Sequence, residues 1–179
     1  MANLKPIDSK NMKKSVFSEN VFSENVFSLI GDKWMLVTAT APDGSYNTMT
    51  ASWGGLGVLW NKKVAFVFIR PQRYTAEFSE AGDTVTLSFF GEEYRKALSF
   101  CGSHSGRDCD KIAETGLTPV KEDGGEVYFA EAELVMKCKK LYRDELREGS
   151  FVCPELLDNY KNKDFHIVYV YEITEILGK

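Results

Sequence analysis

The 179-residue chain has little of what a metal site, a disulfide framework or a nucleophilic active site needs. It has two histidines and four cysteines, and no two cysteines form the C-x-x-C pair of a structural zinc site. The motifs G-x-S-x-G, H-E-x-x-H and G-x-G-x-x-G, which mark a serine nucleophile, a zinc protease and a dinucleotide loop, are absent. We therefore expect no metal ion, and four reduced thiols packed as small hydrophobic side chains.

The chain also lacks a long apolar run and an excess of positive charge. No run approaches the about 18–20 apolar residues of a membrane-spanning helix, and the lysines near the N-terminus precede no apolar signal segment. With 22 basic and 26 acidic residues the net charge is −4, which argues against a dedicated nucleic-acid-binding protein. These absences predict a cytoplasmic protein that binds neither membranes nor nucleic acid.

What the chain does have is the material for one folded domain. Its 44% hydrophobic and 27% charged residues are ordinary for a globular protein of this length. Residues 1–14 are polar and lysine-rich, and residues 16–30 read VFSEN, VFSEN and VFSLI, a period that suits neither a helix nor a strand. The prediction is a loose N-terminal arm over 1–24 and a single domain over 25–179.

Apolar patterning after Gly31 predicts strands joined by short helices. The expected strands are Trp34–Ala41, Thr48–Trp53 (ended by three glycines), Val64–Ile69 (buried on both faces), Thr84–Phe89, Ala130–Lys139 (half-exposed) and Phe165–Ile173. The expected helices are Val26–Ile30 (capped by Asn25 and stopped by Gly31), Tyr74–Ala81, Tyr94–Cys101, one from a cap at Asp108 to Gly116, and Glu155–Tyr160. This pattern favours a mainly β fold, a β-barrel with short peripheral helices.

Two segments have the residue types of a site for a flat, anionic ligand. In TMTASWGG, hydroxyls at Thr48, Thr50 and Ser52 alternate along one strand face, and the glycines allow a ligand to approach the backbone. A solvent-facing edge of threonine and serine would have the same sequence. In RPQRYT, Arg70 and Arg73 precede a helix N-terminus, which suits a phosphate. Two exposed surface arginines are the simpler alternative.

A third segment, SFCGSHSGRD, joins two helices and includes His104 and Arg107. It is small, polar and glycine-rich, so it can close over a ligand, although a plain turn between helices has the same composition. No side chain in these three segments is an obvious nucleophile. Such thin side-chain chemistry suits a protein whose reactivity comes from a cofactor.

In this order, the segments resemble the flavin reductase-like family, close to the flavoredoxins, whose fold is the FMN-binding split β-barrel. The resemblance covers roughly Asn25–Leu177 and is carried by TMTASWGG, VAFVFIRPQRYT, TVTLSFF, FCGSHSGRD and DFHIVYVYEI. It implies a homodimer with one FMN per subunit, and electrons that come from NADH, NADPH or a redox partner protein. Aromatic surface at Tyr169 and Tyr171, which one small domain would leave uncovered, also favours a dimer.

The resemblance also implies site residues by their position in the sequence. His166 would face the nicotinamide and is the only candidate catalytic residue, although a lone histidine is more often a structural residue. The residues implied to bind FMN, first along the ring and ribityl chain, then at the phosphate and then at the flavin mouth, are Thr48, Met49, Thr50, Ala51, Ser52 and Trp53; Arg70, Arg73, Tyr74 and Thr75; and Ser103, Gly106 and Arg107.

Three functions remain open at the level of the sequence. The first is an oxidoreductase of the flavin reductase type that transfers electrons from NAD(P)H to FMN. The second is a flavoredoxin-like electron carrier with tightly bound FMN and little NAD(P)H turnover. The third is a ligand-binding barrel without redox function.

Overall fold

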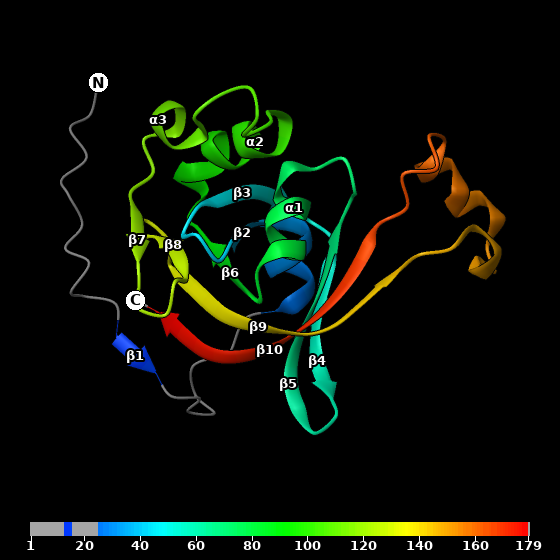
Figure 1. The fold of residues 1–179 in the computed structure, drawn as a ribbon, viewed down its shortest axis with the longest axis horizontal. Coiled ribbons are helices and arrows are strands. Elements are labelled where there is room, and N and C mark those ends of the chain that lie inside the picture. Colours follow the sequence, from blue (N-terminus) through cyan, green and yellow to red (C-terminus); the bar gives the residue numbers. More distant parts are fainter. Residues whose placement is uncertain (1–12, 16–24, 179) are drawn as a thin grey trace.

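A computed structural model describes residues 13–15 and 25–178 of the chain (Figure 1). Apart from residues 13–15, the expected N-terminal arm over 1–24 lies outside the described residues, and so does the VFSEN repeat up to residue 24. Antiparallel strands dominate and the helices are few and short, so the predicted mainly β class is confirmed. Among the residues described, no helix has both the length and the apolar character needed to cross a membrane.

One antiparallel sheet curls around the core. Its strands are β1 (Lys13–Ser15), β2 (Met35–Thr40), β3 (Tyr46–Ala51), β4 (Gly54–Leu59), β5 (Lys62–Ile69), β6 (Thr84–Phe89), β9 (Leu134–Glu145) and β10 (Ile167–Gly178). Neighbours follow the order β3-β2-β6-β9-β10-β5-β4, and β1 pairs with the end of β10. The edge strands β3 and β4 are joined by Ser52 and Trp53 but form no ladder with each other in the described chain, so the sheet is open between them.

Short elements pack against both faces of this sheet, the first of them against the inside of the curl and the others against its outside. They are α1 (Tyr74–Ala81), α2 (Arg95–Ser103), α3 (Lys111–Thr115) and the hairpin of β7 (Pro119–Lys121) and β8 (Val127–Phe129). Short helical segments other than α-helices occupy Ser28–Asp32, Glu92–Tyr94, Glu148–Ser150 and Pro154–Tyr160. The last two belong to residues 146–165, which join β9 to β10 and extend away from the body of the protein; we call them the projecting segment.

Several helix boundaries differ from those predicted; α2, for example, begins at Arg95 and continues past Cys101 to Ser103. The cap of α3 is Asp110 rather than Asp108, because the Asp110 carboxylate accepts from the backbone N–H groups of Ile112 and Ala113. Gly31 lies inside the turn Ser28–Asp32 and does not stop it. Asn25 caps the residues just before this turn, as predicted, since its Oδ1 accepts from Phe27 N at 3.0 Å.

The sequence predicts that Gly54, Gly55 and Gly57 end the strand before them. That strand, β3, does end at Ala51, but the glycines continue the sheet in the next strand. They form β4, and a Cβ on Gly54 would lie 2.9 Å from the Phe66 carbonyl oxygen, so the close approach of these strands requires glycine there. The long strand over 130–139 is also displaced, because β9 begins at Leu134 and runs to Glu145. It is not half-exposed throughout, since Lys137 is buried between Glu122 and Glu175.

The core has two parts, one on each side of β2 and β6. The first fills the inside of the curled sheet, and it contains Tyr169 and Tyr171 with no exposed surface. The expectation that these tyrosines leave aromatic surface for a partner is therefore wrong, because they are on the inward face of β10. The second part lies under α2, where Leu36, Leu98 and Phe129 pack together.

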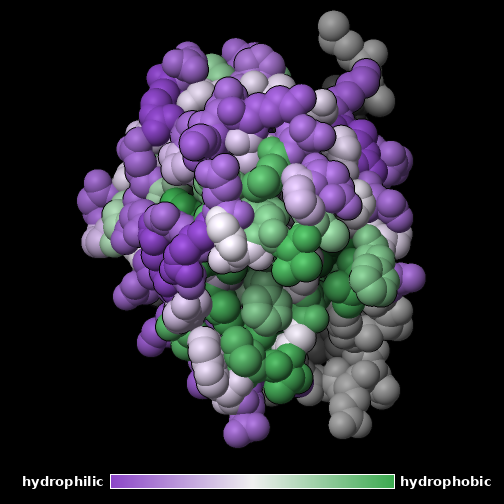
Figure 2. All heavy atoms as spheres, turned by 90° about the vertical axis from the view of Figure 1, so that its right-hand side faces the viewer, coloured by the Kyte–Doolittle hydropathy of each residue, from purple (hydrophilic) through white to green (hydrophobic). Residues whose placement is uncertain are grey.

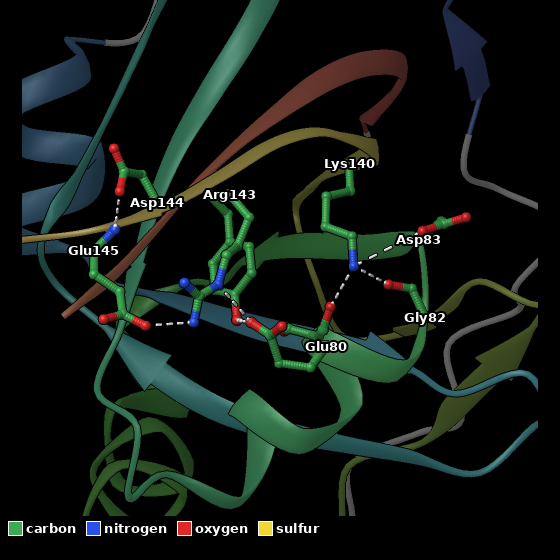
Figure 3. Close-up of polar contacts among 9 residues, drawn as sticks. Glu80, Gly82, Asp83, Lys140, Arg143, Asp144 and Glu145 are labelled. Atoms are coloured by element: carbon green, nitrogen blue, oxygen red, sulfur yellow. Dashed lines mark hydrogen bonds and ion pairs between the residues drawn. The ribbon is translucent and has the colours of Figure 1, made fainter.

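A polar cluster holds the C-terminal end of α1 against β9 (Figure 3). Lys140 Nζ donates to the carbonyl oxygens of Ser79 and Gly82, at 2.7 Å each. Glu80 accepts from the Tyr169 hydroxyl at 2.5 Å and from Arg143 at 3.3 Å. These bonds satisfy the free carbonyls at the end of α1 and orient its other end, the N-terminus, toward β3.

Candidate functional site

Three adjoining recesses follow β3 along its length. We call them the aromatic, the cationic and the outer recess. The aromatic recess has a volume of about 130 Å³ and is lined by Met49, Thr50, Ala51, Ser52, Trp53, Phe68, Arg70, Arg73 and His166. The cationic recess has a volume of about 380 Å³ and is lined by Asn47, Met49, Arg70, Gln72, Arg73, Tyr74, Thr75, Ser103, His104, Ser105 and Lys111. The outer recess has a volume of about 610 Å³ and is lined by Ser45, Tyr46, Asn47, Thr48, Tyr74, Phe78, Gly106, Arg107, Asp108, Cys109, Asp110, Lys111 and Ile112. The cationic recess shares lining residues with each of the other two, so the three form one groove.

The structure brings the predicted site residues together in this groove. Each of the fourteen, from Thr48 in β3 to His166 just before β10, lines at least one recess. They come from segments far apart in the sequence that meet at the open side of the sheet, beside the link between β3 and β4. The sequence missed several lining residues, among them Phe68, Asn47 and Lys111.

Flat side chains form the walls of the aromatic recess. Trp53 is 49% exposed, and its ring centroid lies 5.4 Å from that of His166. Phe68 approaches the same imidazole edge-on at 6.4 Å. Phe68 was missed because the apolar run of β5 predicts burial on both faces, whereas Phe66 and Phe68 lie on a face that is only partly covered. Rings and a half-exposed indole suit a flat aromatic ligand.

His166 is buried, with 7% of its surface exposed, in the wall of the aromatic recess. Its Nδ1 lies 2.9 Å from the Tyr160 hydroxyl. Burial, assisted by the charge of Arg70, lowers the pKa of His166 to about 4. The imidazole is therefore neutral near pH 7, and it can donate or accept one hydrogen bond at each nitrogen according to its tautomer.

The cationic recess is built for an anion. Arg70, Arg73 and Lys111 line it, and none of its lining residues carries a carboxylate. The first residues of α1, Tyr74 and Thr75, also line it, and no side chain caps the N-terminus of this helix. Three cations and an uncapped helix N-terminus together favour a phosphate or carboxylate ligand.

The arginines of the groove differ in how far their charge is already used. Arg70 is paired with Asp164 and donates to the Asn159 carbonyl oxygen at 2.9 Å. Arg107 is paired with Glu77 and lies over the Tyr74 ring. Arg73 has no acidic partner in the described chain, and its guanidinium donates only to the Gly102 carbonyl oxygen, at 2.6 Å. Arg73 is therefore the arginine whose charge is most available to a ligand.

Lys111 has no counterpart among the predicted residues. It is 5% exposed, and its Nζ donates to the carbonyl oxygens of Thr48 and Cys101 at 2.9 Å each. Burial lowers the pKa of its ammonium group. A lysine that follows a capping aspartate normally lies on the surface, so only its packing against β3 and the end of α2 shows that it borders the groove.

The hydroxyl row of β3 is largely used inside the protein. Thr48 Oγ1 lies 3.0 Å from Thr38 Oγ1, and Thr50 donates to the Leu98 carbonyl oxygen. Asn47, which the sequence missed, donates to Thr75 Oγ1 at 2.7 Å and so links β3 to α1. Asn47 therefore fixes α1 to the strand and Thr50 fixes α2, and the groove beside β3 takes its shape from these contacts.

None of the four cysteines is in a disulfide. Cys101 and Cys138 are buried, as predicted, whereas Cys153 is exposed on the projecting segment. Burial raises the pKa of Cys101 to about 11, which keeps this thiol beside the groove protonated. Within residues 13–15 and 25–178 there is no cluster of histidine, cysteine and acidic side chains that could hold a metal ion.

Comparison with known proteins points to one family. A family model described as "Flavin reductase like domain" matches residues 27–176. Among solved structures, the flavoredoxin of Desulfovibrio vulgaris (Miyazaki F) is 22% identical with a TM-score of 0.63, over 92% of this chain and 75% of that one. No curated protein matches the sequence.

Two further structures have the same fold. An FMN-binding domain of a flavin reductase-like enzyme from Shewanella baltica is 16% identical with a TM-score of 0.60, over 86% of this chain and 72% of that one. An NADH:FAD oxidoreductase of Streptomyces globisporus is 16% identical with a TM-score of 0.59, over 80% and 73%. The predicted split-barrel fold is therefore confirmed.

Proposed function

The chain belongs to the flavin reductase-like domain family, and from that premise we propose that it binds FMN in the groove along β3 and works as an oxidoreductase that takes electrons from NADH or NADPH. The observation that carries the proposal is the junction of the aromatic recess with the cationic recess, which has three cations and no carboxylate. FMN matches this arrangement, because its flat ring would fit the aromatic recess and its phosphate, joined to the ring by a short polar chain, would fit the cationic recess.

The lining residues have distinct tasks in this proposal. Trp53 and Phe68 would contact the faces and edge of the flavin ring. Arg73, Lys111 and the N-terminus of α1 would hold the phosphate, since charge-assisted hydrogen bonds are the stronger ones. Bound FMN would supply the redox chemistry that these side chains cannot, and the protein would supply orientation and a dry, shaped surface.

The test is anaerobic mixing of the purified, FMN-loaded protein with NADH or NADPH, followed by the flavin absorbance. We expect rapid bleaching with at least one nicotinamide. Tightly bound FMN that bleaches only slowly would favour the flavoredoxin-like carrier, which reacts with a partner protein. A protein that neither holds nor takes up added FMN would contradict both flavin functions and leave a ligand-binding barrel without redox function.

We also propose a homodimer. The large apolar side chains Val58, Trp60, Val152 and Leu156 are 74%, 55%, 95% and 50% exposed. Figure 2 shows hydrophobic side chains gathered on the face to which the projecting segment points. Large exposed apolar patches on a protein often mark the surface through which it binds another protein chain. Light scattering is expected to give twice the chain mass of 20.2 kDa; a monomer at micromolar concentration would contradict the dimer.

A further inference from the structure

One contact in the aromatic recess has no place in the function proposed so far. Tyr160, in the projecting segment, places its hydroxyl 2.9 Å from Nδ1 of His166. In the described part of the chain this is the only hydrogen bond of either side chain. Tyr160 itself does not line the groove, whereas His166 does. The phenol therefore contacts the site only through the imidazole.

The hydrogen-bonding capacity of the two groups decides which of them donates. A neutral imidazole carries one N–H, and a phenol can donate once. If Nδ1 carried the proton, it would donate to the phenol oxygen, and the phenol O–H would then be left without an acceptor in a side chain that is only 8% exposed. If the phenol donates to Nδ1, the imidazole proton is on Nε2. This nitrogen has no partner in the described chain but is not among its fully buried unpartnered atoms, so water or a ligand in the recess that His166 lines can accept from it. An unsatisfied buried donor is costly, so the second arrangement wins.

Tyr160 is held in place for this contact on several sides. Its ring stacks on Phe165 at 4.9 Å and packs against Phe151 at 5.6 Å. The Arg70 guanidinium lies 5.2 Å above the ring, and Arg70 is itself anchored by Asp164. A phenol locked by packing and by a cation has little freedom to turn its hydroxyl away from Nδ1.

We propose that Tyr160 is a positioning residue that fixes His166 as the Nε2–H tautomer, so that the aromatic recess presents a hydrogen-bond donor. The ligand group that this donor recognises is an acceptor on a flat heterocycle, a ring carbonyl oxygen or an unprotonated ring nitrogen. The identity of the heterocycle as flavin or nicotinamide rests on the proposed function. The tautomer itself does not, because it is a property of the protein without ligand.

The tautomer is read directly from the side-chain nitrogen resonances of the ¹⁵N-labelled full chain without FMN. The chain has only two histidines, so the variant His104→Gln assigns the signals of His166. We expect a proton on Nε2 and an unprotonated, hydrogen-bonded Nδ1 in the parent. In Tyr160→Phe, which keeps the ring and its packing, we expect a mixture of tautomers. A proton on Nδ1 in the parent, or an unchanged tautomer in Tyr160→Phe, would overturn the proposal.

The consequence for the site is measured on the FMN-loaded protein. In Tyr160→Phe the rate of flavin reduction is expected to fall roughly 2–10-fold, the effect of one neutral hydrogen bond, with unchanged FMN content. The matched control is Tyr142→Phe, which removes an exposed phenol that bonds Asp144 outside the groove and is expected to change neither quantity. A rate equal to the parent's would show that the donor does not act on the ligand, whereas a parent without FMN would contradict the proposed function and leave the tautomer result standing.

Discussion

Replacement of Arg73 by alanine is expected to weaken FMN binding roughly 10–150-fold, the value of one charge-assisted hydrogen bond of about 1.5–3 kcal/mol. Arg73 lines both the aromatic and the cationic recess, and the only described hydrogen bond of its side chain is to the Gly102 carbonyl oxygen. Its charge is therefore not neutralised by a carboxylate before the ligand binds. Titration of the apoprotein with FMN, followed by flavin fluorescence, measures the effect.

Two comparisons separate a phosphate contact from a general loss of structure. Riboflavin lacks the phosphate, so the Arg73→Ala variant and the parent are expected to bind it about equally. Arg95→Ala is the matched variant, because Arg95 also donates to a backbone carbonyl, that of Asp32, at 2.7 Å, but lies outside the groove. It is expected to leave FMN affinity unchanged. Equal FMN affinity in Arg73→Ala and the parent would remove Arg73 from the phosphate site.

Replacement of His166 by asparagine is expected to slow flavin reduction by NAD(P)H on the order of 100-fold, with FMN still bound, because a misplacement of about 1 Å can change a rate by this factor. His166 is in the wall of the aromatic recess, 5.4 Å from Trp53 between ring centroids. Single-turnover reduction under anaerobic conditions measures the rate. An unchanged rate with a normal melting temperature and full flavin content would contradict the role on the nicotinamide side.

The same variant tests whether His166 is only a structural residue. Its pKa in the folded protein, about 4, is below the ordinary 6.5. Between these two pH values the unfolded chain therefore binds a proton at this residue and the folded chain does not. The stability contributed by neutral His166 is thus complete above about pH 6.5 and is lost as the pH falls toward 4. We expect this slope in the free energy of unfolding to vanish in His166→Asn. A variant that melts early and loses its flavin would favour the structural role.

Local patterning was sufficient for most elements and for the composition of the site. The strict alternation of Thr84–Phe89 predicted β6, and the i, i+4, i+7 spacing of Tyr74, Phe78 and Ala81 predicted α1, because period and capping are properties of the local chain. The glycines of β4 misled, since their meaning depends on the strand beside them: Gly54 marks a close approach to Phe66 rather than a break.

The sequence by itself therefore determined the class of the fold, the order of most of its strands and helices though not, for example, β4, β7 and β8, and the segments that meet in the groove. Only the tertiary structure decided which charges remain available there, that of Arg73 rather than the already paired Arg70, and that Lys111 is buried beside them. It also decided that Tyr169 and Tyr171 are core and that Tyr160 contacts His166. The physical reason is that ion pairing, burial and hydrogen-bond partners arise between residues far apart in the chain, and no local period encodes them.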